Sequence, residues 1–235
     1  MGQPRKSESN IPNLALQTFD PNEQYAAVVR HRLPHWSQPG TITFITWRTW
    51  DSMPAPVVED WLVRRDAWLR HHGINPLLSN WRSRLDSLPE AARTEFKRLL
   101  SDRWNDHLDA LHGQCVLSRP EFTRMIADSL IHFDGDRYVL TDYVVMPNHV
   151  HVLAAFSSEE GMLQQCESWK HFTARQINQA LCRKGQFWQQ DDFDHLVRSS
   201  DDFDRYRLYI GDNPIRARLN AGQFLHYSKP LTPKS

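Results

Sequence analysis

The sequence is poor in cysteine and carries no net charge, and both absences exclude common classes of protein. It holds three cysteines and no CxxC pair: Cys115, Cys166 and Cys182. An odd number at unrelated spacings argues against a disulfide framework, so we expect reduced thiols. Lys plus Arg and Asp plus Glu both number 28, which gives a formal net charge of zero. A surface for nucleic acid would therefore have to be a local basic patch.

Long apolar segments are absent as well. No run approaches the roughly 20 apolar residues that a membrane-spanning helix needs. Residues 1–24 are polar and lack the apolar core of a secretory signal, so we expect a disordered N-terminal tail there. These absences predict a cytoplasmic protein that does not contact a membrane.

The most informative pattern in the chain is a pair of histidines within an apolar, β-branched run, VVMPNHVHVL. Side chains alternate along a strand, so His149 and His151 would point to one face and Val150 and Val152 to the other. Two imidazoles on one face of a rigid strand are suitable metal ligands. Two surface histidines on an edge strand would give the same pattern, so other parts of the chain must decide between these interpretations.

A second polar group is predicted on a helix that begins near Ser200. Tyr209 and Asn213 are four residues apart and would share one face of this helix, which Pro214 should limit. If that face lies over the histidine strand, two imidazole nitrogens and one amide oxygen converge, and such a set can hold Mg²⁺ or Mn²⁺. A tyrosine beside a phosphate that a metal polarises could cut DNA through a phosphotyrosine intermediate. A packed aromatic at Tyr209 and a helix-end residue at Asn213 are the plain alternatives.

The predicted elements follow the order β-α-β-α-β-β-α-α. This order suits an α+β domain in which helices cover an antiparallel sheet. The histidine strand would be central, because its opposite face carries Val150, Val152 and Ala154 for burial. A helical region at about residues 74–113 is predicted to be an insertion, and residues 114–117 a short strand.

Basic and aromatic side chains are interspersed in residues 24–50, and this stretch contains no acidic residue. This combination suits single-stranded nucleic acid, which offers phosphates for pairing and bases for stacking. Two further basic groups lie on the predicted helix at residues 162–181 and in the C-terminal segment. The predicted DNA contacts are Arg30, Arg32, Trp36, Arg48, Lys170, Arg175, Arg216 and Arg218.

Several motifs, taken in order, resemble those of the REP-associated tyrosine transposases, the single-tyrosine branch of the HUH endonucleases. They are Arg32-Leu33-Pro34-His35-Trp36, Met146-Pro147-Asn148-His149-Val150-His151, Phe187-Trp188, Asp194-His195, Arg198, Tyr209-Ile210 and Asn213-Pro214. The resemblance covers roughly residues 25–219 apart from the helical insertion. It implies a ferredoxin-like fold, with His149, His151 and Asn213 as ligands of Mg²⁺ or Mn²⁺ and Tyr209 as the nucleophile.

The resemblance also implies a substrate and an organisation of the chain. The substrate would be single-stranded DNA hairpins of repetitive extragenic palindromes, cleaved and rejoined through a 5′-phosphotyrosine with release of a 3′-hydroxyl. A tail at 1–24, one HUH transposase-like domain at 25–219 and a basic tail at 220–235 are expected. The protein would be a nucleoid-associated bacterial transposase, either a monomer or a homodimer. The alternatives are a domesticated hairpin-binding protein that no longer cuts, and an unrelated metallohydrolase in which the tyrosine only orients the substrate.

Overall fold

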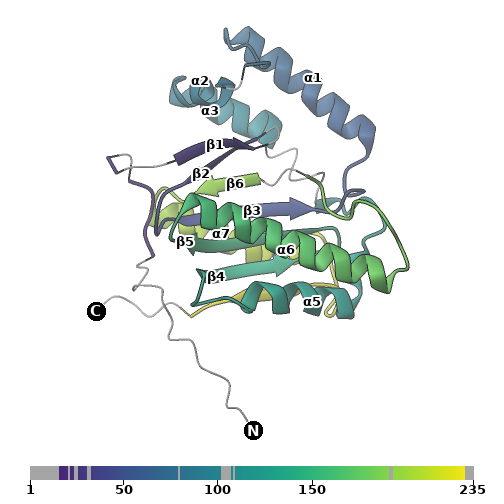
Figure 1. The fold of residues 1–235 in the computed structure, drawn as a ribbon. Helices are drawn as coiled ribbons and strands as arrows, with labels where there is room; N and C mark the ends of the chain where they lie inside the picture. Colours follow the sequence, from purple (N-terminus) through teal and green to yellow (C-terminus); the bar gives the residue numbers. More distant parts are fainter. Residues whose placement is uncertain are drawn as a thin grey trace. The chain divides into compact units, whose positions relative to one another are not determined.

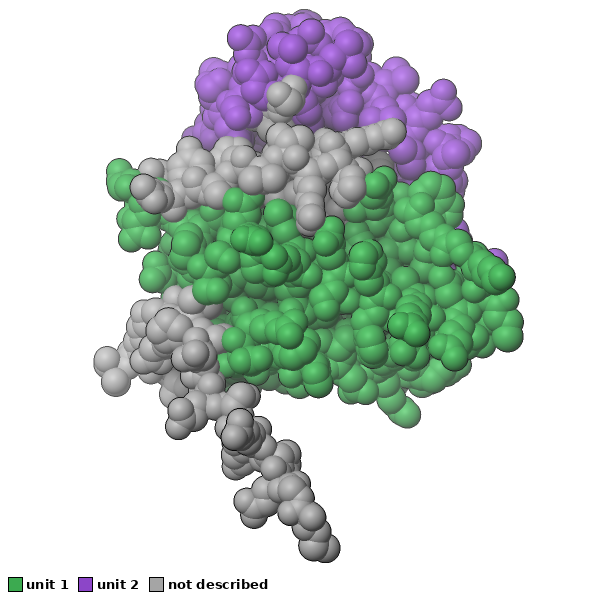
Figure 2. Space-filling view, in the orientation of Figure 1, with its two compact units in different colours: residues 1–50, 116–235 green, residues 51–115 purple. Residues whose placement is uncertain are grey.

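The structure is a computed structural model that describes residues 16–230 apart from 21, 24–25, 31–32, 79, 102–106, 108 and 191–192. The chain forms two compact units, one of residues 1–50 and 116–235 and one of residues 51–115 (Figure 2). The predicted insertion at about 74–113 lies within the second unit. The two units are described separately below.

A five-stranded antiparallel sheet with the order β6-β3-β5-β4-β7 forms the first unit (Figure 1). In chain order, its first four strands alternate with helices α5 and α6 as β-α-β-β-α-β, which is the ferredoxin-like arrangement. The predicted α+β fold is therefore confirmed, and the histidine strand β5 is central. The elements are β3 Ile42–Arg48, α5 Pro120–Ile131, β4 Tyr138–Val145, β5 His149–Phe156, α6 Glu159–Ala180, β6 Phe193–Leu196 and β7 Leu225–Ser228.

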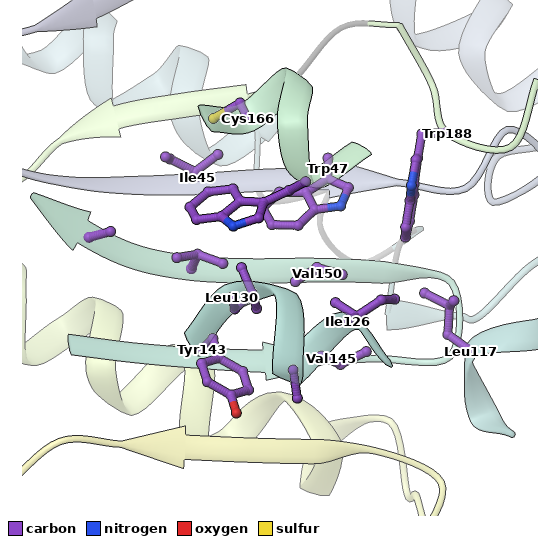
Figure 3. Packing of buried hydrophobic residues seen from close by; sticks show 14 of the residues in the cluster. Ile45, Trp47, Leu117, Ile126, Leu130, Tyr143, Val145, Val150, Cys166 and Trp188 are labelled. Carbon is purple, nitrogen blue, oxygen red and sulfur yellow. The ribbon is translucent and has the colours of Figure 1, made fainter. Parts of the chain in front are cut away.

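Helices α5 and α6 cover the face of the sheet on which Val150 and Val152 lie, and the main core forms there (Figure 3). Trp47 of β3 stacks on Trp169 of α6, with ring centroids 5.7 Å apart. The hydroxyl of Tyr138 donates to the carbonyl of Leu130 at 2.6 Å, so the polar end of this buried ring is satisfied. Large apolar side chains buried in this way contribute about 1.5–3 kcal/mol each, so this face fixes the strand that carries the histidines.

Helix α7, Ser200–Arg216, is the element that packs on the histidine face. Its N-cap is Ser199, whose hydroxyl accepts from the backbone N–H of Asp202 at 3.1 Å, one residue before the predicted start. Pro214 was expected to limit the helix, which includes Pro214 and ends two residues later at Arg216. Pro214 lies in the last turn, where its missing N–H removes one hydrogen bond at the end of the helix.

A buried ion pair fixes α7 to the sheet. The guanidinium of Arg207 donates to the carboxylate of Asp142 in β4 at 2.9 Å, and to the hydroxyl of Ser228 and the carbonyl of Lys229. The Asp142 side chain is 1% exposed and that of Arg207 is 25% exposed. The pair therefore joins α7, β4 and β7 at one point.

Arg207→Met should lower the free energy of unfolding by about 3 kcal/mol, because it leaves a buried carboxylate without its cation. Urea denaturation measures this loss. Arg205→Met is the matched control, since Arg205 forms a surface pair with Asp202 at 2.8 Å on the same helix and its side chain is 52% exposed. The control should lose less than about 1 kcal/mol, and equal losses in the two variants would contradict the proposed difference.

Both predicted tails are partly wrong. The backbone N–H groups of Gln17 and Phe19 donate to the carbonyls of Gly40 and Val197, at 3.0 and 2.8 Å. This part of residues 1–24 is thus hydrogen-bonded to the neighbouring backbone, while residues 1–15 lie outside the described residues. The basic tail at 220–235 contains β7, which pairs with β4 and adds an edge strand to the sheet. Tyr227 of β7 also stacks on Tyr143, with ring centroids 5.3 Å apart.

A two-stranded hairpin of β1, Ala26–Arg30, and β2, Leu33–Ser37, also belongs to the first unit. The predicted strand at residues 114–117 is wrong, because Val116–Ser118 is a short 3₁₀ helix before α5. The N–H of Leu117 in that turn donates to the carbonyl of Pro147 at 3.0 Å. This hydrogen bond joins the turn to the loop that precedes the histidine strand.

The second unit is helical and has a small core of its own. Its helices within the described residues are α1 Ala55–His71, α2 Trp81–Asp86, α3 Glu90–Phe96 and a π-helical turn Lys97–Ser101. The core residues are Leu69, Ile74, Trp81, Phe96 and Leu100. Helix α1 contributes to this core, so the helical unit begins before residue 74.

The two ends of the helical unit meet at Gly113. A Cβ on Gly113 would lie 2.5 Å from the carbonyl oxygen of Asp51, and the residue has a φ of +90°. Glycine is therefore required on steric and backbone grounds. The carboxylate of Asp51 also accepts from the N–H of Gln114 at 2.8 Å.

Across the described ranges, no helix has the combined length and apolar character that crossing a membrane demands.

Candidate metal and nucleophile site

Two buried histidines on the central strand β5 form the floor of the site. Their imidazole centroids are 4.6 Å apart, and both residues are at most 1% exposed. In the register of the sheet, His149 lies opposite Arg48 and His151 opposite Thr46 of β3. The plain alternative of surface histidines on an edge strand is therefore excluded.

Helix α7 brings Tyr209 and Asn213 to the same place. The Nδ2 of Asn213 is 3.4 Å from the Nε2 of His151, and the Asn213 side chain is buried. The ring of Tyr209 lies edge-on to the His151 ring with centroids 5.1 Å apart. The structure thus brings together all four residues that the sequence predicted for the metal and nucleophile site, while their roles remain predictions.

The Nδ1 atom of each imidazole has a close partner. The Nδ1 of His149 is 2.7 Å from the Oδ1 of Asn148, and the Nδ1 of His151 is 2.7 Å from the hydroxyl of Thr46. Within the described part of the chain, the Nε2 of His149 and the Oδ1 of Asn213 have no hydrogen-bond partner at normal geometry. Buried polar atoms without partners are costly, so these two atoms are candidate ligand positions.

Burial also determines the charge of the site. It lowers the pKa of His149 to about 3; Asn213 raises this pKa and the charge of Arg48 lowers it. Burial, with a contribution from His149, lowers the pKa of His151 well below its ordinary value of 6.5. Both imidazoles are therefore neutral near pH 7, which is the form that binds metal ions.

The donor set fits a divalent cation. Among the described residues, no group of three or more His, Cys, Asp or Glu could hold a metal ion. Beside the two imidazoles, the buried amide of Asn213 is the candidate for a third protein ligand. Two imidazole nitrogens and one amide oxygen leave coordination positions for water or a phosphate, as Mg²⁺ or Mn²⁺ requires.

Aromatic residues surround the site in a way that the sequence did not predict. Phe44 of β3 stacks on Tyr206 with centroids 4.4 Å apart and on His151 with centroids 5.3 Å apart. Tyr209 meets the edge of the same Phe44 ring at 5.9 Å. The alternation of β3 could have placed Phe44 on the same face as Thr46, but the pairing of β3 with β5 is not encoded locally. Burial raises the pKa of Tyr206.

Two of the predicted DNA contacts lie near these residues. Arg48 is half-buried and lies opposite His149 in the sheet. The guanidinium carbon of Arg216 is 5.7 Å from the centroid of the Tyr209 ring. Arg218 is exposed just beyond the end of α7.

Two further predicted DNA contacts, Lys170 and Arg175, are not brought to the site. Lys170 and Arg175 are on α6, which covers the opposite face of the sheet, and the ammonium of Lys170 donates to the carbonyl of Gln190 at 2.9 Å. Arg30 and Trp36 are in the β1–β2 hairpin, but their side chains are outside the described ones. Arg32 is itself outside the described residues.

Comparison with known proteins gives one distant likeness. No protein-family model matches the chain, and no curated protein matches it. The chain is similar to a solved structure of a REP-associated tyrosine transposase bound to a REP hairpin, with 13% sequence identity and a TM-score of 0.38. The match covers 80% of this chain and 74% of that chain. A likeness this distant does not establish a shared family or a shared function.

Proposed function

We propose that this chain is a metal-dependent, single-stranded DNA endonuclease and strand transferase of the HUH tyrosine type. The observation that carries the proposal is the convergence of four side chains from β5 and α7 at one buried position. The 3.4 Å approach of Asn213 to His151 and the edge contact of Tyr209 with the same imidazole define that position. A tyrosine packed against one of two neighbouring neutral, buried histidines suits attack on a phosphate better than it suits a purely structural role.

Each residue has a distinct role in the proposed reaction. His149, His151 and Asn213 would hold a Mg²⁺ or Mn²⁺ ion, which when bound would polarise an oxygen of the scissile phosphate. The phenolic oxygen of Tyr209 loses its proton and forms a bond to phosphorus. The bond between phosphorus and the 3′ oxygen breaks, and that oxygen takes up a proton. The products are a 5′-phosphotyrosine and a free 3′-hydroxyl, and the reverse reaction rejoins a strand.

The proposed substrate is a folded single strand, as the motif resemblance implies, and the protein would act on bacterial DNA in the nucleoid. A labelled DNA hairpin with a single-stranded flank, incubated with the protein and Mn²⁺, should give a protein–DNA adduct that survives denaturation. The adduct should disappear when a chelator replaces the metal. Cleavage without any adduct would instead favour a metallohydrolase, and binding without cleavage would favour a hairpin-binding protein.

Trp50 is an exposed aromatic residue on the segment that follows β3. Its backbone N–H donates to the carbonyl of Phe187 at 2.8 Å, and its backbone carbonyl accepts from the side-chain amide of Gln189 at 2.7 Å. The backbone is thus held at both groups while the Trp50 residue is 54% exposed. An indole presented in this way can stack on an unpaired base.

Trp50→Ala should raise the dissociation constant for the hairpin at least about fivefold, because one stacked base contributes about 1–3 kcal/mol. Fluorescence anisotropy at fixed salt measures this change. Phe172→Ala is the matched control, because Phe172 is an aromatic residue with 49% exposure on α6. An unchanged affinity in Trp50→Ala would remove this residue from the proposed DNA surface.

A further inference from the structure

We propose that Asn148 and Thr46 are positioning residues that hold both imidazoles with the proton on Nδ1, so that both Nε2 lone pairs face the space beside Asn213. The inference rests on the proposed metal site, because a neutral imidazole binds a cation only through a nitrogen without a proton. It assigns a specific task to two residues that are not themselves ligands. Outer partners of metal-bound histidines commonly fix the ring in this way.

For His149 the argument follows from the chemistry of the partner. The Oδ1 of Asn148 can only accept a hydrogen bond, and it is 2.7 Å from the Nδ1 of His149. With the Asn148 amide oriented so that its oxygen faces the ring, the proton is on Nδ1 and a lone pair is left on Nε2. That Nε2 atom forms no hydrogen bond of normal geometry with a described residue, and the residue is 0% exposed. The side chain of Asn213 lies near enough to raise the pKa of His149. A buried lone pair without a donor is the state that a cation would satisfy.

For His151 the argument depends on both ring nitrogens, because the hydroxyl of Thr46 can either donate or accept. The Nδ2 of Asn213 is a donor, and it approaches the Nε2 of His151 at 3.4 Å. An accepting Nε2 carries no proton, so the Nδ1 proton is donated to Thr46 at 2.7 Å. Asn213 thus meets the His151 lone pair only weakly, at a distance longer than an ordinary hydrogen bond.

The positions of Asn148 and Thr46 explain why they can do this reliably. Asn148 comes directly before β5 and is fully buried, and its carbonyl accepts from the N–H of Thr49 at 2.8 Å. Thr46 lies in β3 directly opposite His151. Each partner is therefore fixed by the backbone of the sheet, so the orientation of the rings is set before any metal binds.

Long-range ¹H–¹⁵N NMR of the full-length, metal-free protein at neutral pH tests the proposal directly. The spectrum should show both histidines with a protonated Nδ1 and an unprotonated Nε2. An Nε2–H form at either histidine would overturn the assignment for that residue. This readout needs neither metal nor DNA, so it is distinct from a failure of the proposed function, which would appear as absence of Mn²⁺ binding and of the covalent adduct.

Variants then test whether the partners cause this state. Thr46→Val keeps the shape of the side chain and removes the hydroxyl, and Asn148→Ala removes the acceptor. Each should give mixed protonation of its own histidine and weaken Mn²⁺ binding by about 10- to 100-fold in calorimetry. Thr46→Ser and Asn148→Asp, which keep an oxygen at the same place, should restore the Nδ1–H state. Folded Thr46→Val or Asn148→Ala protein with unchanged NMR signals and unchanged Mn²⁺ affinity would overturn the proposal.

Discussion

Tyr209→Phe is expected to abolish both DNA cleavage and the covalent adduct, with a loss of about 10³-fold or more, while hairpin binding stays close to that of the unaltered protein. The substitution removes one oxygen and keeps the ring that meets Phe44 and His151. Loss of a catalytic nucleophile reduces turnover by several orders of magnitude in enzymes with covalent intermediates. Cleavage gels and adduct formation measure the first effect, and anisotropy measures the second.

Tyr206→Phe is the matched control for this prediction. Tyr206 lies on the same helix and also stacks on Phe44, but Asn213 is seven residues away from it and four from Tyr209. The control should still cleave the hairpin and form the adduct. If Tyr209→Phe continued to cleave, water would be the nucleophile and the chain would be a metallohydrolase. If only Tyr206→Phe lost the adduct, the nucleophile would be misassigned.

His149→Ala and, separately, His151→Ala are expected to abolish cleavage and to weaken Mn²⁺ binding by at least about 10-fold to 100-fold. Each removes one of two buried nitrogen ligands, and carbon cannot replace it. Asn213→Ala should have a smaller effect, because water can replace an amide oxygen. Calorimetric titration with Mn²⁺ measures affinity, and the cleavage assay is run at limiting Mg²⁺.

His171→Ala is the control for the histidine variants, because His171 is exposed on α6. It should bind Mn²⁺ and cleave DNA as the unaltered protein does. Thermal unfolding in the presence of a chelator separates loss of metal binding from loss of the fold. Full activity of both His149→Ala and His151→Ala would exclude these residues as ligands.

Local sequence patterns predicted the parts of the site that lie within one element. Strand alternation placed His149 and His151 on one face, and helical spacing placed Tyr209 and Asn213 on another. That the helix face with Tyr209 lies over the strand face with the histidines could only be stated as a condition, since no local pattern encodes which face of a sheet a helix covers. The same limit explains why Lys170 and Arg175 are not at the site: their helix was predicted correctly, but it lies on the other side of the sheet.

Contacts between distant strands were the part that could not be predicted. Thr46 is 105 residues away from His151, and only the register of β3 with β5 makes it a hydrogen-bond partner. The pairing of β7 with β4 and the attachment of Gln17 near Thr41 depend on non-local hydrogen bonds in the same way. Polar composition indicated tails in both places, because composition does not report where a backbone finds a partner.

The closure of the helical unit at Gly113 and Asp51 has a consequence for how this chain can vary. After β3 the polypeptide builds a separate core, and the two ends of this segment lie side by side at Asp51 and Gly113. Because the two ends of this segment lie side by side, a change in its length or sequence does not require the strand with the histidines or the helix with the tyrosine to move.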